Sequence, residues 1–490
     1  MLRRMTLSLR LLAILLAVAL ASCLVTSVQA QQYTQQTPSS LEPLKLEREK
    51  LDERLDRVEA ILEELKAERK KARSEREDFQ KRLDRGKLAV ETLKAAHEKQ
   101  GRKWETQFDE IRRDPRNRLE GTGADAGWIS IPGRKTDLRF GGFIQLNVIH
   151  DFQNVGLNFG KFQVSRIPVP TDNTSNTEFD PRTTRMIFET RTDTSLGKIS
   201  TFLSADWWGS DENSDPPELR LRQAYITGVG FLSGKAVTVG QATSTFMDLA
   251  VWPEMFDLGG PASFIFVRQG LIRWSSEIDE AKHWIASFGI EQPDTEVTNG
   301  DGQTDWPDAV ARMDGNHDWG HLMGAVIVRQ LKATSTSGTG TDRAFAWGLN
   351  LGGKLAVPGT ADNLKFQVQG GKGIGRYVDA ELVNGGQDAV YNNATEKLEP
   401  LKEFGALAYY QHWWTDKLRS TVGGSYVRVD NRSAEPSNSL KSVIYTLANL
   451  IYSPVKPLDV GIEYHWGQHE IKNGRTGHAN RLMVSMKWRL

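Results

Sequence analysis

The chain has 490 residues, 39% of them hydrophobic and 25% charged, and its 62 Lys and Arg residues are balanced by 62 Asp and Glu residues. This zero net charge disfavours a general nucleic-acid-binding protein, which usually carries a basic excess. Cys23 is the only cysteine, which excludes a disulfide scaffold and a cysteine-rich zinc site. Beyond the N-terminus no apolar run is long enough for a transmembrane helix, but a β-barrel, whose signal is alternation, is compatible with this composition.

Residues 1–30 are predicted to be a secretory signal peptide. Arg3, Arg4 and Arg10 precede the apolar run 11–21, and Val28-Gln29-Ala30 offers a small-residue cleavage site. Leu20-Ala21-Ser22-Cys23 also resembles a lipoprotein processing site, which would leave Cys23 as a lipidated N-terminus. We favour cleavage near Ala30, because a barrel needs no lipid anchor to stay in its membrane.

After a polar segment, 31–43, residues 44–120 are predicted to form a periplasmic coiled coil. They are rich in Glu, Lys, Arg and Leu, and apolar residues recur every seven positions, which implies a left-handed supercoil. One seam position holds Leu44, Leu51, Val58, Leu65, Ala72, Phe79 and Leu93, and the other holds Arg48, Leu55, Leu62, Arg69, Arg76, Leu83 and Val90. Such a seam is buried only against another helix, so an oligomer is expected. A single charged helix or a disordered spacer is the alternative.

A glycine-containing linker, 121–136, leads into residues 137–490, where short runs alternate apolar and polar residues as half-buried strands do. About sixteen runs begin near residues 138, 183, 197, 218, 235, 264, 282, 306, 319, 342, 362, 403, 418, 442, 457 and 479. Their connections alternate between short and long. Tight turns at one end and long loops at the other are typical of an outer-membrane barrel. The predicted fold is therefore an all-β transmembrane barrel of about sixteen antiparallel strands behind an N-terminal coiled coil.

The inward faces of such strands line an aqueous channel, so they decide what passes. Alternation points a set of arginines into the lumen: Arg139, Arg185, Arg191, Arg220, Arg222, Arg273, Arg312 and Arg481, with Arg268 and Arg376 near strand ends. Arginine binds carboxylates and phosphates bidentately, so these residues are candidate anion-binding groups. Glu189, Asp206 and Glu291 offset part of the charge, and the arginines could instead brace the wall.

Several motifs resemble DcaP-like porins, in the same order along most of residues 128–490. They are Trp128–Gly133, Leu138–Phe143, Arg220–Tyr225, Gly240–Asp248, Pro253-Glu254, Asp257–Pro261, Pro307-Asp308, Ala311-Arg312, Gly373–Tyr377, Gly461–Tyr464 and Asn480-Arg481. Members of that family are homotrimeric outer-membrane channels with sixteen strands and an N-terminal periplasmic coiled coil, and they favour dicarboxylates and other small anions. The resemblance implies that residues 244–263 form a third external loop folded into the lumen, with Asp248, Glu254 and Asp257 opposing the wall arginines. One departure is the C-terminal Leu490, because barrels of this kind usually end in an aromatic residue.

The predicted function is passive, partly selective diffusion of small anionic solutes through a trimer embedded in outer-membrane lipid. One alternative is a structural tether that joins the outer membrane to peptidoglycan through the coiled coil, and another is a phosphate-type pore. The sequence shows no arrangement typical of an enzyme and predicts no catalytic residue, cofactor or metal. His317 and His321 are four apart, but Gly320 and the strand pattern argue against a helical zinc pair.

Overall fold

The computed structural model describes residues 48–50, parts of 52–92, residues 128–130, and residues 135–490 apart from 157–159, 210–216, 233–234, 282, 337–339 and 383–386. The chain divides into two compact units, Met1–Gln107 and Phe108–Leu490. The predicted leader with Cys23, the polar segment 31–43 and residues 121–127 of the predicted linker lie outside the described residues.

In the first unit, residues 73–88 form an α-helix. Phe79 and Leu83 lie four residues apart on one side of this helix and are 67% and 43% exposed. Both belong to the predicted heptad seam, so their exposure fits a helix that needs partners, and the coiled coil itself stays a prediction. In the part of the chain that the structure describes, no helix combines the length and apolar character needed to cross a bilayer.

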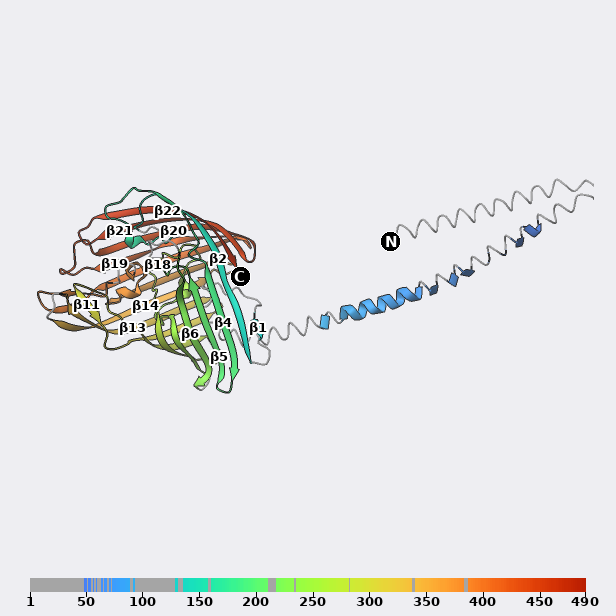
Figure 1. Ribbon diagram of the computed structural model, residues 1–490, viewed down its shortest axis with the longest axis horizontal. Helices are drawn as coiled ribbons and strands as arrows, with labels where there is room; N and C mark the ends of the chain where they lie inside the picture. Colours follow the sequence, from blue (N-terminus) through green and yellow to red (C-terminus); the bar gives the residue numbers. More distant parts are fainter. Residues whose placement is uncertain are drawn as a thin grey trace, which may run out of the picture. The chain divides into compact units, whose positions relative to one another are not determined.

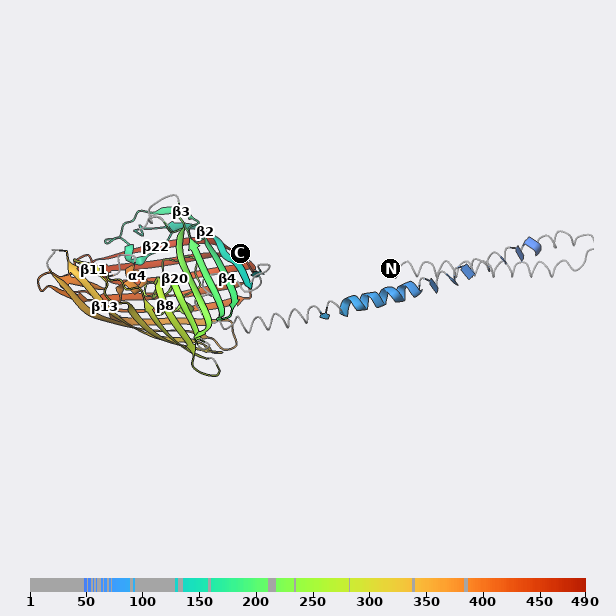
Figure 2. The same ribbon diagram turned by 60° about the horizontal axis from the view of Figure 1, so that its bottom comes forward.

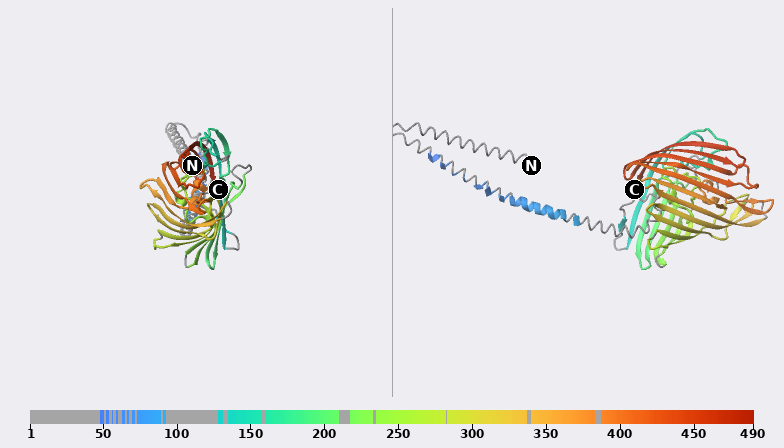
Figure 3. Two further views of the ribbon diagram at one scale, coloured as in Figure 1. Left: turned by 90° about the vertical axis from the view of Figure 1, so that its left-hand side faces the viewer. Right: turned by 180° about the vertical axis from the view of Figure 1, so that it is seen from behind.

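In the second unit, sixteen antiparallel strands of the described residues close into a barrel (Figures 1 and 3). They are β2 (Thr136–Asp151), β4 (Arg185–Thr194), β5 (Gly197–Asp206), β6 (Arg220–Leu232), β7 (Lys235–Thr243), β8 (Arg268–Glu277), β9 (Trp284–Glu291), β12 (Asp308–His317), β13 (Gly320–Ser335), β14 (Thr341–Ala356), β15 (Asn363–Lys372), β18 (Lys402–Thr415), β19 (Leu418–Asp430), β20 (Leu440–Val455), β21 (Leu458–Ile471) and β22 (Thr476–Arg489). The barrel closes where β22 pairs with β2, with Arg489 opposite Phe143. Each predicted run begins within four residues of one of these strands, which confirms the sixteen-strand barrel.

Alternation along β2 shows why these segments form membrane strands. Phe140 and Ile144 face outward and are 67% and 57% exposed, whereas Gln145 and Asn147 face inward and are 2% and 1% exposed. An apolar outer face suits lipid, and a polar inner face suits a wet lumen. Closure gives each of these sixteen strands a neighbour on both sides, so their backbone groups pair within the sheet.

Shorter elements occupy the connections. β1 (Trp128–Ser130), β3 (Asn176–Asp180) and β11 (Gly300–Gln303) extend the barrel sheet, and β10 (Val297–Thr298), β16 (Ala389–Asn392) and β17 (Lys397–Pro400) form a second, three-stranded sheet. Figure 2 shows β3 beside the end of β2. The long connections also hold η1 (Val164–Arg166), η2 (Leu249–Val251), η3 (Gly375–Tyr377) and the short helix α4 (Asp379–Leu382).

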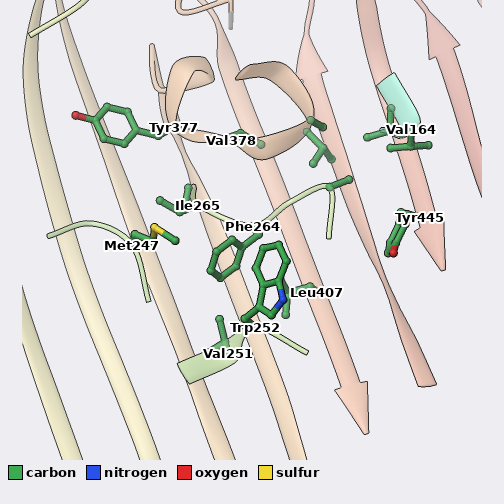
Figure 4. Close-up of a cluster of buried hydrophobic side chains, with 14 of the residues drawn as sticks. Val164, Met247, Val251, Trp252, Phe264, Ile265, Tyr377, Val378, Leu407 and Tyr445 are labelled. Carbon is green, nitrogen blue, oxygen red and sulfur yellow. The ribbon is translucent and has the colours of Figure 1, made fainter. Parts of the chain in front are cut away.

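The main apolar core lies inside the barrel, where long connections pack on the inner faces of the strands. Trp252 and Phe264, both from the β7–β8 connection, meet edge to face with ring centroids 4.9 Å apart. Figure 4 shows these two side chains beside Leu407 of β18. The same cluster takes wall residues from β12, β13, β18, β19, β20 and β22. Loops therefore cover this side of the inner wall.

Candidate functional site

The connection between β7 and β8, residues 244–267, enters the barrel and is called the inward loop here. Its backbone is held by polar side chains of the wall: Asn350 donates to the Phe246 carbonyl at 2.8 Å, Lys365 to the Trp252 carbonyl at 2.6 Å, and Gln145 to the Phe256 carbonyl at 3.0 Å. These donors lie on β14, β15 and β2, so the loop runs across the lumen from one part of the wall to another.

The three carboxylates that the family resemblance places in this loop are each paired with a wall cation. Asp248 accepts from His321 at 3.0 Å and lies 3.5 Å from Arg312, and Asp257 lies 3.0 Å from Arg481. Glu254 lies 2.5 Å from a guanidinium nitrogen of Arg419. Burial acts to raise the pKa of Asp248, but the hydrogen bond from His321 and the nearby positive charges outweigh it, and the pKa is lowered overall. These carboxylates therefore anchor the loop by direct ion pairs.

Three of the predicted pore arginines lie in these buried contacts. Arg481 is 1% exposed and binds the Asp151 carboxylate through two nitrogens, at 2.7 and 2.9 Å. Arg312 is 4% exposed and donates twice to Asp314. Arg376, in η3, donates to Gln269 at 2.8 Å and is 7% exposed. Arg312 and Arg481 lie on inward-facing positions of strands and Arg376 lies in η3, and carboxylates, amides and loops cover all three.

Two further arginines that the sequence analysis did not select belong to the same networks. Arg329 on β13 reaches Asp308 at 3.0 Å and Asp388 at 2.7 Å and is 2% exposed. It was missed because its neighbours Ile327 and Leu331 are apolar as well as inward-facing, so β13 lacks a polar inner stripe. Arg419 lies directly after a short turn. Its alternation with Thr421 is the only feature of the sequence that indicates an inward-facing side chain.

The remaining predicted arginines of the strands lie on β2, β4, β6 and β8, and we call Arg139, Arg185, Arg191, Arg220, Arg222 and Arg273 the arginine wall. Arg139 donates to Glu189 at 2.5 Å, and Arg191 donates to Asp137 at 2.6 Å. These two pairs balance their charges. Their arginine side chains are 16% and 13% exposed, so they are more accessible than the anchors of the inward loop.

Arg220 and Arg222 differ because they converge on a single carboxylate. Arg220 binds Asp206 through two nitrogens, at 3.0 and 2.8 Å, and Arg222 reaches the same group at 2.6 Å. A β-bulge opposite Ser204 and Ala205 brings both arginines to the inner face. The Asp206 side chain is fully buried, whereas that of Arg220 is 30% exposed, which is the largest exposure among the ion-paired members of the arginine wall described here.

The other predicted arginines make different contacts. Arg273 is 3% exposed and donates to the Thr243 carbonyl at 3.2 Å, and the Arg185 guanidinium lies 5.4 Å from the centre of the Phe143 ring. Arg268 begins β8 and lies 5.0 Å from the ring of Phe266. Arg268 lies in the register opposite to that of the inward-facing residues of β8, so it is not part of the arginine wall.

This arrangement places cationic groups along the inner wall, where they can bind anions. Guanidinium groups follow one another along the inner wall from Arg220 near the start of β6 to Arg191 near the end of β4. Weak sites in series favour passage over retention. Across the described residues, no group of three His, Cys, Asp or Glu side chains is placed to hold a metal ion.

A closed antiparallel barrel with an apolar exterior, arginines and other polar groups on part of its inner wall, and a loop folded into the lumen defines an outer-membrane channel. Residues 121–489 match the family model described as DcaP outer membrane protein. The chain belongs to this family, and it is an outer-membrane porin. A comparison with curated proteins found no match.

One solved structure agrees with this assignment at the level of the fold. The chain is similar to the outer membrane channel DcaP of Acinetobacter baumannii, with 20% identity and a TM-score of 0.64, over 75% of this chain and 100% of that one. It also matches OmpT of Vibrio cholerae, with 10% identity, a TM-score of 0.46 and coverage of 74% and 99% of the two chains. An anion-selective porin from Comamonas acidovorans matches with 11% identity and a TM-score of 0.46, over 72% and 100%.

Proposed function

We propose that this porin favours the passive diffusion of small anionic solutes, carboxylates in particular, along the arginine wall. The observation that carries the proposal is the convergence of Arg220 and Arg222 on Asp206. Two guanidinium groups converge on this one carboxylate, so Asp206 by itself offsets only one of the two positive charges. Because 30% of the Arg220 side chain is exposed, a solute in the lumen can approach this side chain.

The distribution of apolar and polar residues supports a path on this side of the lumen. The core cluster of the loops takes its wall residues from β12 to β22, whereas Ser200, Tyr225 and Ser275 on β5, β6 and β8 are only half-buried on the inner face. A solute that enters from the side of the long connections and follows the inner faces of β4 to β8 meets Arg220 first. It meets Arg139 and Arg191 later, near the short turns. The inward loop would form the opposite side of the path and narrow it.

Carboxylates and phosphates share the geometry that a guanidinium fork recognises, so the wall fits both. Both classes of solute are singly or doubly charged at neutral pH, and the balanced pairs Arg139–Glu189 and Arg191–Asp137 suit weak binding of either. We favour carboxylates because the motifs of the chain resemble those of porins that favour dicarboxylates. Block of ion current by succinate and by inorganic phosphate separates the two classes. Stronger block by phosphate than by succinate would contradict the preference for carboxylates.

Substitution of Arg220 tests the proposal. In planar bilayers, Arg220→Gln is expected to lower the permeability of chloride and succinate relative to potassium, and Arg220→Lys is expected to retain most of it, because Lys keeps the charge. The shift should shrink at high salt, which screens exposed charges. Arg343→Gln is the matched control, because Arg343 has a side chain that is 54% exposed, in the register of the outward face. Equal selectivity of Arg220→Gln and Arg343→Gln would refute the proposal.

We further propose that the protein is a homotrimer whose helical segment lies in the periplasm, close to peptidoglycan. The exposed pair Phe79 and Leu83 supports association through the helix, since a chain alone leaves this apolar seam in water. The outward faces of the strands would contact outer-membrane lipid.

A further inference from the structure

The short strand β1 occupies a particular place in the barrel seam. Trp128 pairs with Arg139 of β2, and Ser130 pairs with Asp137. β4 binds residues 136–143 of β2, so β1 must lie on the other edge, which is the edge that β22 occupies from Phe143 to Asp151. The amide of Leu490 donates to the Gly142 carbonyl at 3.0 Å, next to the residues that β1 covers. β1 therefore continues the seam where β22 ends.

Register determines which face of the wall Trp128 joins. Directly opposed residues of an antiparallel pair lie on the same face of the sheet. Ile129 opposes Leu138, shares the outer face and is 60% exposed. Trp128 opposes Arg139 and so lies on the lumen face with the arginine wall.

The indole contacts two members of the arginine wall. The guanidinium of Arg139 lies 4.9 Å from the centre of the Trp128 ring, and that of Arg191 lies 4.2 Å from it. Both arginines keep their carboxylate partners, Glu189 and Asp137. An aromatic face attracts a cation without cancelling its charge, so the indole restrains both guanidinium groups and leaves their charge unchanged.

These contacts lie at the end of the barrel where β4 turns into β5 between Thr194 and Gly197. A bulky ring on the inner face there takes up space beside the last arginines of the path. The segment Trp128–Gly133 is one of the motifs that resemble porins, and the proposed role of the arginine wall does not explain why it is present.

We propose that Trp128 is a specificity-determining residue at the short-turn mouth of the channel. Its indole positions Arg139 and Arg191 and narrows this mouth, so that solutes pass an aromatic face backed by two fixed guanidinium groups. This proposal rests on the channel function of the family and does not require that anions be preferred.

Single-channel recordings of the full-length protein test it. Trp128→Ala widens this mouth, so it is expected to raise conductance and to raise the permeability of citrate relative to acetate. The change should be about twofold or more, because a cation–π contact at a partly exposed site is weak. Trp128→Phe, which keeps an aromatic face, should stay close to the unsubstituted protein. Ile129→Ala is the matched control, because Ile129 lies on the same strand but faces outward.

If Trp128→Ala fails to assemble, Trp128→Leu keeps an apolar side chain in β1 and should show the same changes to a smaller extent. Conductance and size dependence in Trp128→Ala or Trp128→Leu equal to those of Ile129→Ala would overturn the proposal. A cation-selective wild-type channel would refute the anion preference, and the conductance comparison would still decide the role of Trp128.

Discussion

At the scale of single residues, some inward-facing arginines anchor the inward loop and others keep an accessible part. Arg481 is enclosed by Asp151 and Asp257 and holds the inward loop to β22. Arg220, which shares Asp206 with Arg222, leaves part of its side chain in the lumen. Charge alone cannot separate the two kinds, because the difference lies in how many carboxylates and loops surround each guanidinium.

Removal of an anchor should cost stability. Arg481→Gln leaves two buried carboxylates without their cation, and loss of one partner of a buried ion pair typically costs about 3–5 kcal/mol. We expect a clear drop in the urea midpoint of the refolded barrel in detergent. Arg343→Gln, which breaks an exposed pair with Asp305, should change the midpoint little. Equal midpoints for the two variants would show that Arg481 is not an anchor.

Asp379 in α4 predicts a pH dependence of stability. Burial raises the pKa of its carboxyl to about 8, against opposing charges of Lys161 and Arg268. The folded protein therefore keeps a proton that the unfolded chain releases near the ordinary value of 3.8. The free energy of unfolding should fall as pH rises from about 4 to about 8 and then level off as far as this group is concerned.

Asp379→Asn removes this titration, so the variant should gain stability relative to the wild type as pH rises through that window. Urea unfolding at pH 5, 7 and 9 measures the difference. The exposed Asp301→Asn is the control and should run parallel to the wild type. A constant difference between Asp379→Asn and the wild type would contradict the assigned pKa.

At this scale the sequence predicted which side of the barrel wall a residue occupies better than it predicted which side chains surround that residue. Alternation with period two gave the inward register of Arg139, Arg185 and Arg481, because a strand reverses side with every residue. It could not tell that Asp257 reaches Arg481, since the two are far apart in sequence and meet only after the loop folds. The direction of the Arg268 side chain could not be predicted either, because this residue starts β8 and the preceding loop determines the direction of the chain there.

At the scale of elements, the strands were predicted well and the folded connections were not. The largest offset in strand start is at β8, predicted near residue 264 and observed from Arg268. Phe264 and Ile265 are fully buried, and Ile265 forms a bridge with Val378 in another connection. Their apolar character reflects the packing of two loops. The small sheet of β10, β16 and β17 was missed because it joins segments about ninety residues apart.

The inward loop should control the width of the channel. Replacement of residues 249–262 by a short Gly-Ser linker removes η2 and the Trp252 ring from the lumen, so single-channel conductance should rise. Replacement of the exposed turn 358–361 by Asn-Gly is the control, because this turn lies between β14 and β15 outside the loop cluster. An unchanged conductance in the loop variant would show that the loop does not narrow the path.

At the scale of the whole molecule, the described helix 73–88 and the barrel expose apolar residues to different surroundings. The helix 73–88 leaves Phe79 and Leu83 exposed to water, whereas the barrel turns its apolar residues toward lipid. Heptad spacing predicts burial of the seam against other copies but does not fix their number, because Arg76 and Gly86 interrupt it.

Polar substitutions in this seam should weaken the oligomer. Phe79→Asp combined with Leu83→Asp is expected to lower the temperature at which the oligomer separates in semi-native electrophoresis, because charged groups at seam positions oppose helix association. Lys81→Asp, on the opposite side of the helix, is the control. Separation of both variants at the wild-type temperature would argue against a role of the seam in assembly.

The most direct test of the central claim is the zero-current potential of the wild-type channel in a planar bilayer that separates two concentrations of potassium chloride. A wall with net positive charge predicts the sign that corresponds to faster passage of chloride, and an effect that weakens as both concentrations rise. A zero-current potential of the opposite sign, with potassium as the faster ion, would contradict the account.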